Sequence, residues 1–171
     1  IRDRYPGLVT RAVIKDIGPE IAEVGLNRIK SYVGMGGPFA DWDEARVYLK
    51  SASAEIFPDW QDAQWAVFAH QCYVERDGQV IVDYDPRIAE PLAAENNDTE
   101  ADALWSLFAA MSAVPSLLIR GELTDLLTES CVAKMCEGHP DMAVLSVPRV
   151  GHAPMLTESG VTEAICEFLT A

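Results

Sequence analysis

Leu117-Leu118-Ile119-Arg120-Gly121-Glu122-Leu123-Thr124-Asp125 decides the fold of this 171-residue chain, together with Val144-Leu145-Ser146-Val147-Pro148-Arg149-Val150-Gly151-His152. Each stretch opens with a short apolar run, which predicts a buried strand. In each stretch the strand is followed by a turn that contains a glycine and then by a side chain suited to catalysis, Asp125 in the first and His152 in the second. One helix and one strand fit between Asp125 and His152, so a right-handed crossover would bring both loops to the same carboxyl-terminal edge of a parallel sheet.

Apolar runs and helix signals elsewhere extend this pattern. Ala12-Val13-Ile14 predicts an earlier strand, Thr128 can cap a helix over 129–137, and a last helix is expected over 161–169. The order strand, long insertion, strand, helix, strand, helix is typical of α/β architecture with parallel strands. Because three short parallel strands rarely form a stable sheet alone, we expect another segment to pair with this part.

The long insertion, from Glu20 to about Ala113, is predicted to be mainly helical. Asp41, followed by Glu44, predicts one helix start, and Asp59 is expected to cap the next helix. That second helix has an apolar stripe at helical spacing, which we expect to face inward. The stripe consists of Trp60, Ala63, Val67, His70 and Val74.

Further signals place a hairpin and another helix later in the insertion. Arg76-Asp77-Gly78-Gln79 predicts a tight turn, because Asp-Gly tolerates the positive φ that such turns need. A helix over 100–111 is expected to turn Leu104, Leu107 and Phe108 inward. His139, between Gly138 and Pro140, is expected to end a helix at the surface.

Composition limits the partners. Thirteen basic and 27 acidic residues give a net charge of −14 and a pI near 4.4, which excludes nucleic acid and anionic membranes as expected partners. The four cysteines form no CxxC pair and no zinc spacing, so we expect no metal site and reduced thiols in a cytoplasmic protein. No apolar run approaches the length of a membrane span.

The sequence resembles the C-terminal part of an α/β-hydrolase-fold enzyme. Four segments carry the resemblance: 13–20, Tyr84-Asp85-Pro86, 117–127 and Val150-Gly151-His152-Ala153-Pro154. It implies a partial core made of residues 1–18 and 115–171, with a mainly helical cap at 19–114 inserted over the active site.

The same resemblance implies roles for the residues at the strand ends. His152 would be the base of a catalytic triad and Asp125 the acid that orients it. Asp16 also follows a strand and is the reserve acid, since some relatives carry the acid at this earlier strand; a simple turn carboxylate is the preferred reading of Asp16. The cap residues expected to line a pocket are Trp42, Trp60, Trp65 and His70.

The nucleophile of such a triad is missing from the sequence. A nucleophile elbow has the pattern G-x-S-x-G, because the strained turn needs small neighbours. None of the nine serines has glycine at both positions, and no equivalent aspartate or cysteine pattern occurs. Residues 1–8 resemble the end of the helix that follows the elbow. We therefore expect the nucleophile on an N-terminal half of the same enzyme or on a complementary chain.

These features predict a hydrolase of small carboxylic esters, lactones or related acyl substrates that needs no cofactor. Two other chemistries of the fold stay open: hydrolysis of a C–C bond, and epoxide or haloalkane hydrolysis with an aspartate nucleophile. A non-enzymatic alternative is an inactive fragment that serves as an interaction domain. Acting alone, the 171-residue chain is expected to be inactive.

Overall fold

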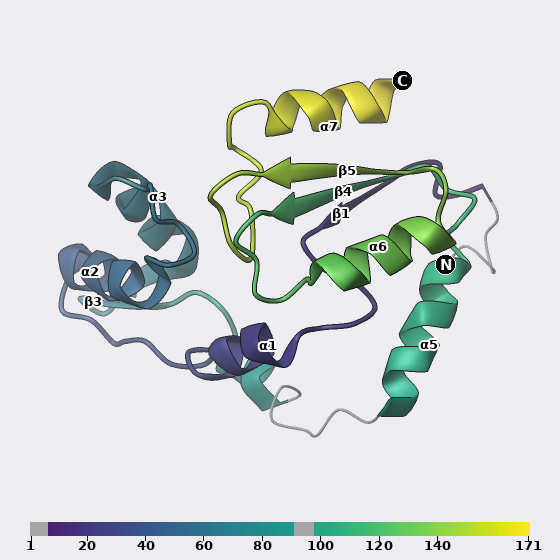
Figure 1. Ribbon diagram of the computed structural model, residues 1–171. Helices are drawn as coiled ribbons and strands as arrows, with labels where there is room; N and C mark the ends of the chain where they lie inside the picture. Colours follow the sequence, from purple (N-terminus) through teal and green to yellow (C-terminus); the bar gives the residue numbers. More distant parts are fainter. Residues whose placement is uncertain (1–6, 91–97) are drawn as a thin grey trace. The chain divides into compact units, whose positions relative to one another are not determined.

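Three parallel strands form the central sheet of the computed structural model, which describes residues 7–90 and 98–171 (Figure 1). The strands are β1 (Ala12–Lys15), β4 (Ser116–Gly121) and β5 (Met142–Val147), in the order β1-β4-β5. Ile14 pairs with Leu118, which in turn pairs with Val144. Because all three strands run parallel, their carboxyl ends share one edge, and the three strands predicted from the sequence are confirmed.

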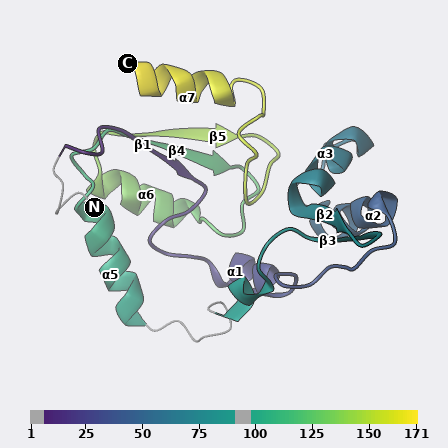
Figure 2. The ribbon, with the colours of Figure 1, turned by 180° about the vertical axis from the view of Figure 1, so that it is seen from behind.

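Helices cover both faces of this sheet. Figures 1 and 2 show α6 (Glu129–Gly138) and α7 (Val161–Thr170) on opposite sides of it. The predicted cap of α6 is confirmed, because the Thr128 hydroxyl accepts a hydrogen bond from the backbone N–H of Cys131 at 3.1 Å. Residues of α5, β4, α6 and β5 and of the loop before α6 build the core, which contains Phe108, Leu118, Leu127, Cys131, Met135 and Met142.

Two compact units divide the chain. The first consists of the stretches up to Leu26 and from Asn96 onward, and the second is Asn27–Glu95. The sequence instead predicted boundaries after residues 18 and 114. The difference arises at both ends: α5 (Asp98–Ala109) packs Phe108 into the core of the first unit, and the start of α1 (Glu23–Lys30) binds to the same unit.

The inward face of α5 is narrower than predicted. Phe108 is buried, but Leu104 is 44% exposed and Leu107 is 64% exposed. The prediction for these two leucines was wrong: among the side chains of α5 that the structure describes, those that contact this core are Trp105 and Phe108. The helical period identifies an apolar face but not how much of it a neighbour covers.

His139 is buried, at 1% exposure, and the expectation of a surface position was wrong. Its ring packs against Phe108, with 5.8 Å between ring centroids. Neither ring nitrogen has a hydrogen-bond partner within the described residues. His139, directly after α6, is therefore held by packing against Phe108. Its Gly-His-Pro context had suggested contact with solvent instead.

Glu20 joins the segment after β1 to two helices. Its Oε1 accepts hydrogen bonds from Nε1 of Trp105 at 2.6 Å and from Nζ of Lys134 at 2.7 Å. The same ammonium lies 3.9 Å from the centroid of the Trp105 ring, a cation–π geometry. The hydrogen bond from Lys134, followed by that from Trp105, lowers the pKa of the Glu20 carboxyl below its usual value.

We expect this lowered pKa to make the stability of the first unit depend on pH. A carboxyl whose pKa is lower in the folded than in the unfolded state stabilises the fold above its unfolded pKa of about 4.3, and this contribution is lost as the pH falls through the folded pKa. Thermal unfolding as a function of pH should therefore show a smaller loss on acidification in Glu20→Gln than in the wild type. Glu137→Gln, at an exposed position of α6, is the matched control, and equal acid sensitivity in all three proteins would contradict the prediction.

The first helix that lies entirely within the second unit begins at a confirmed cap. Oδ1 of Asp41 accepts the N–H of Glu44 at 2.8 Å, and Oε2 of Glu44 accepts the N–H of Ala40 at 2.7 Å, at the start of α2 (Trp42–Ser53). The first bond satisfies a donor that the first helical turn leaves free, and the second holds the residue before the cap.

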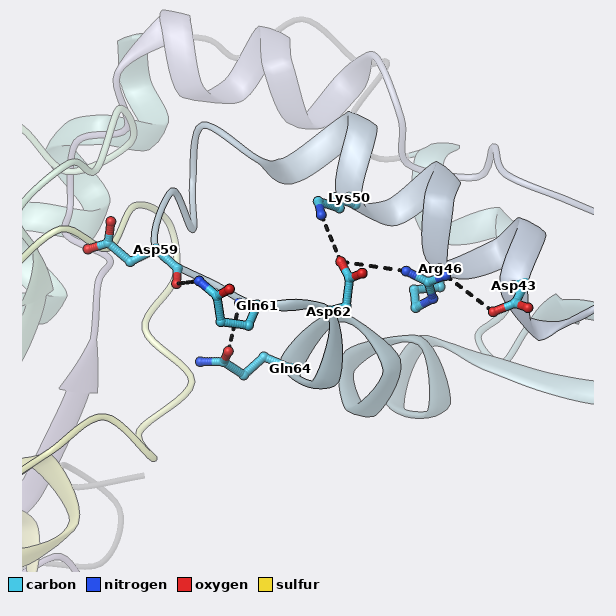
Figure 3. A network of polar contacts seen from close by, with 7 residues as sticks. All are labelled: Asp43, Arg46, Lys50, Asp59, Gln61, Asp62 and Gln64. Carbon is cyan, nitrogen blue, oxygen red and sulfur yellow. Dashed lines mark hydrogen bonds and ion pairs between the residues drawn. The ribbon is translucent and has the colours of Figure 1, made fainter.

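The start of the next helix, α3 (Asp62–Cys72), differs from the prediction. Gln61 takes the cap position instead of Asp59, and its N–H donates to Oε1 of Gln64 at 2.7 Å (Figure 3). The helix thus starts two residues later than expected. In the non-helical stretch before it, the backbone carbonyl of Asp59 accepts a hydrogen bond from the Gln61 side chain at 3.1 Å. Asp62 then ties α3 to α2 through Lys50 at 2.7 Å.

The buried face of α3 is not the predicted stripe. Trp65 and Ala69 are each 1% exposed, whereas Val67 is 61% exposed and His70 is exposed. The helix is apolar almost all round, so its spacing could not select a face. The buried face is set instead by an aromatic cluster, in which Trp65 packs with Phe57, Trp60 and Phe68.

A hairpin follows α3 and confirms the predicted turn. Strand β2 (Tyr73–Arg76) pairs antiparallel with β3 (Gln79–Val82), and both turn residues, Asp77 and Gly78, have positive φ. A short 3₁₀ turn, η1 (Pro86–Ile88), comes next. In neither of the two described stretches is a helix long and apolar enough to cross a membrane.

Candidate active site

An aspartate and a histidine meet at the carboxyl edge of the sheet. Nδ1 of His152 lies 2.9 Å from Oδ2 of Asp16. Asp16 directly follows β1, and His152 follows β5 after a loop of four residues. The Asp16 side chain is fully buried, whereas 20% of the His152 side chain is exposed, so solvent or a substrate can reach the imidazole but not the carboxylate.

Asp16 is held by its backbone and by both of its carboxylate oxygens. Its N–H continues the strand ladder by donating to the carbonyl of Ile119 at 2.8 Å. Its φ of +48° lies in the left-handed region, which aspartate tolerates better than most residues. Oδ1 accepts the backbone N–H of Gly121 at 3.0 Å, which leaves Oδ2 for His152. A buried carboxylate needs such partners, and here each oxygen has one.

The loop before His152 is fixed against the end of β4. The N–H groups of Glu122 and Leu123 donate to the carbonyls of Val147 and Val150, both at 2.9 Å. Gly121 makes this docking possible, because a Cβ added there would lie 2.5 Å from the carbonyl oxygen of Val150 and 2.7 Å from that of Gly151. Close approach of two backbones therefore explains the glycine that the sequence places at the end of this strand.

The contact with Asp16 decides what His152 can do chemically. A carboxylate only accepts hydrogen bonds, so in the neutral imidazole the proton lies on Nδ1 and the lone pair on Nε2. Nε2 makes no hydrogen bond within the part of the chain that the structure describes. An oriented imidazole with a free lone pair at a strand end is the arrangement of a general base.

Asp125, the acid that the sequence favours, lies elsewhere. Its side chain is half-buried, and its backbone carbonyl accepts the N–H of Gly25 at 3.1 Å. Gly25 lets α1 come this close, since a Cβ there would lie 2.7 Å from that carbonyl oxygen. The hydrogen bond from the N–H of Thr124 to the carbonyl of Gly121 turns the chain back after β4, and this turn carries Asp125 to the start of α1.

The structure thus brings together His152 and the reserve acid, Asp16, in place of Asp125. A spacing argument could not separate the two acids, because each follows a strand that ends at the same edge. One local signal does distinguish Asp16: it follows its strand directly, whereas Asp125 lies four residues after the end of β4.

The aromatic residues expected in a pocket form two groups within the second unit. Trp42 packs against His70 with 3.8 Å between ring centroids and a tilt of 36° between the ring planes, and Nε1 of Trp42 donates to Glu75 at 3.3 Å. Trp60 stacks on Phe57 at 3.8 Å and contacts Trp65. Trp65 packs in the interior of this unit, whereas Trp42 and Trp60 are half-buried and His70 is exposed, so these three keep a surface that could contact a ligand.

Comparison with known proteins gives relatives that are hydrolases. No protein-family model matches the chain. The 3-hydroxybutyrate-oligomer hydrolase of Cupriavidus necator is 29% identical over 170 residues, which cover 95% of this chain and 57% of that protein. An α/β-hydrolase of Novosphingobium aromaticivorans has a similar structure, with a TM-score of 0.88 and 35% identity over 99% of this chain and 59% of the other.

A third relative is E-2-(acetamidomethylene)succinate hydrolase, with a TM-score of 0.72 and 26% identity over 98% of this chain and 60% of that one. The chain therefore spans between 57% and 60% of the length of these three proteins. The likeness extends over nearly the whole of this chain and includes the parallel sheet that carries the Asp16–His152 pair at its edge. The chain has the fold of the C-terminal portion of an α/β-hydrolase, and these relatives support its assignment to the α/β-hydrolase superfamily.

Proposed function

We propose that the chain supplies the acid and the base of a hydrolase acting on small ester, lactone or related acyl substrates. The observation that carries this proposal is the buried Asp16 carboxylate against Nδ1 of a partly exposed His152. Two relatives are named as hydrolases of a 3-hydroxybutyrate oligomer and of E-2-(acetamidomethylene)succinate, and the class common to both names supports hydrolysis.

In the proposed reaction, His152 moves protons and Asp16 positions it. A serine hydroxyl attacks the substrate carbonyl carbon while Nε2 of His152 takes the hydroxyl proton, and the imidazolium then gives that proton to the leaving oxygen. Water, deprotonated by Nε2 in the same way, hydrolyses the acyl–enzyme and regenerates the serine. Asp16 fixes the tautomer and stabilises the imidazolium without itself taking the proton.

The serine of this scheme comes from outside the 171 residues, since the sequence contains no elbow pattern. We propose as its source an N-terminal half of the same enzyme or a complementary chain. The second unit would serve as a cap over the substrate, with Trp42, Trp60 and His70 as candidate contacts for the acyl or alcohol part. Aromatic faces of this kind favour apolar substrates.

We assign the acid to Asp16 in preference to Asp125 on contact and burial. Asp16 touches the imidazole and is shielded from water, so its effect on the tautomer is direct. Asp125 has a structural function that needs no catalysis, because its backbone anchors the start of α1.

The proposal is tested by replacing His152 in the complete enzyme that carries the nucleophile. We expect His152→Ala to lower kcat for p-nitrophenyl butyrate by roughly 10⁴-fold or more, because the base is lost and no other group takes its place. His70→Ala is the matched control and should act mainly on KM. Undiminished turnover in a folded His152→Ala protein would overturn the proposal and favour the non-catalytic alternative. His152-dependent turnover by the 171-residue chain alone would show instead that the nucleophile is within it.

A further inference from the structure

We propose that Glu122 is a positioning residue for His152, and this inference rests on the proposed function of that histidine. The Glu122 carboxylate closes the turn at Arg149, and the turn sets where the base stands relative to Asp16. Glu122 itself touches neither ring nitrogen, so its effect would pass through the backbone of residues 149–151.

The first step is an irregularity in the ladder between the ends of β4 and β5. Consecutive N–H groups, those of Glu122 and Leu123, donate to carbonyls three positions apart, at Val147 and Val150. Residues 148 and 149 therefore bulge out of the register that the two strands keep up to the pair Gly121–Val147. Such bulges re-aim the chain that follows them, and the chain that follows this one carries His152.

The second step is a hydrogen bond from the bulge to Glu122. Pro148 has no N–H to donate, and Arg149 adopts a φ of +56°, an uncommon conformation for a residue other than glycine. The N–H of Arg149 points to Oε2 of Glu122 at 2.7 Å, a short, charge-assisted hydrogen bond. The side chain of Glu122, just after β4, thereby stabilises the uncommon backbone conformation of Arg149, two residues after β5.

The third step connects this turn to the pair itself. The carbonyl oxygens of Val150 and Gly151 approach Gly121 so closely that a Cβ there would clash with both. The N–H of the same glycine donates to Oδ1 of Asp16. The same three residues, 121–123, thus hold the acid on one side and the loop of the base on the other. A turn at Arg149 that opens would displace Val150 and Gly151, and the distance between Nδ1 and Oδ2 would change with them.

The exposure of the Glu122 side chain distinguishes positioning of the loop from packing in the core. Glu122 is exposed, so its truncation leaves no cavity, and its loss should affect the loop more than the global free energy of unfolding. Glutamine is the conservative replacement, because its amide oxygen can still accept the N–H of Arg149. Glu137→Ala, at an exposed position of α6, removes a carboxylate from the same unit without touching the loop.

The experiment measures kcat, KM, the melting temperature and the far-downfield proton NMR signal of the Nδ1–H that faces Asp16, all in the complete enzyme. We expect Glu122→Ala to lower kcat roughly 10- to 100-fold, because a misplacement of a catalytic group by about 1 Å can cost on the order of 100-fold, with KM changed less than about twofold. The downfield signal should broaden or disappear in Glu122→Ala and persist in Glu122→Gln and Glu137→Ala.

Three results would count against this role. An unchanged kcat and downfield signal in Glu122→Ala, in an enzyme that His152→Ala inactivates, would overturn the positioning role and leave the proposed function intact. A loss of activity that only follows a lowered melting temperature, and that Glu122→Gln shares, would assign Glu122 to stability instead. Full activity of His152→Ala would remove the proposed function itself.

Discussion

Asp16→Asn should lower kcat for acyl hydrolysis by roughly 10³- to 10⁴-fold, the loss expected when the amide of asparagine stabilises the wrong histidine tautomer. Asparagine has the shape of aspartate, so Oδ1 can still accept the N–H of Gly121. Its NH₂ group would then face Nδ1 of His152 and donate to it, which places the imidazole proton on Nε2. The base would present a proton where it needs a lone pair. Steady-state kinetics of the complete enzyme, which carries the nucleophile, with p-nitrophenyl butyrate measure the loss.

Asp125→Asn is the matched control for this substitution. The side chain keeps its shape, and the backbone carbonyl that holds Gly25 is unchanged, so we expect kcat to stay within about tenfold of the wild type. Circular dichroism would establish that both variants are folded. The opposite order of effects, a large loss in Asp125→Asn and a small one in Asp16→Asn, would assign the acid to Asp125.

The sequence predicts the edge of the sheet at which His152 lies but not which acid contacts it there. Short apolar runs identify the three strands, and parallel strands direct their carboxyl ends to one edge, so His152 could be placed there from the sequence. Asp16 and Asp125 both follow strands of this sheet. The turn from Gly121 to Thr124 separates them, because it folds Asp125 back toward α1, and a turn of this kind depends on tertiary contacts.

Local signals in the helices succeed where one hydrogen bond decides and fail where packing decides. Asp41 and Thr128 cap their helices as predicted, because a short side chain next to free N–H groups is sufficient. The inward faces of α3 and α5 could not be predicted, since α3 carries apolar residues on almost every side and α5 is oriented by the packing of Trp105 and Phe108 on the core. His139 shows the same limit, because only its tertiary neighbour, Phe108, explains its burial.

Gly121→Ala is the second substitution from which we expect a large effect, on both stability and activity. The added Cβ would lie 2.5 Å from the carbonyl oxygen of Val150 and 2.7 Å from that of Gly151, closer than real Cβ contacts come. Both atoms are backbone, so no rotamer change relieves the clash. We expect a loss of roughly 1–3 kcal/mol in the free energy of unfolding, the usual cost of overpacking. Chemical denaturation measures this loss.

Activity should fall further than the lost stability explains, because the backbone that must move leads directly to His152 and the N–H of Gly121 also holds Asp16. Gly138→Ala is the matched control: it lies at the end of α6, and a Cβ there meets nothing within 4 Å. Alanine at Gly138 should leave kcat unchanged and shift stability by less than about 1 kcal/mol. If Gly121→Ala were as stable and as active as Gly138→Ala, the loop of His152 would not be held by the close approach of these two backbones.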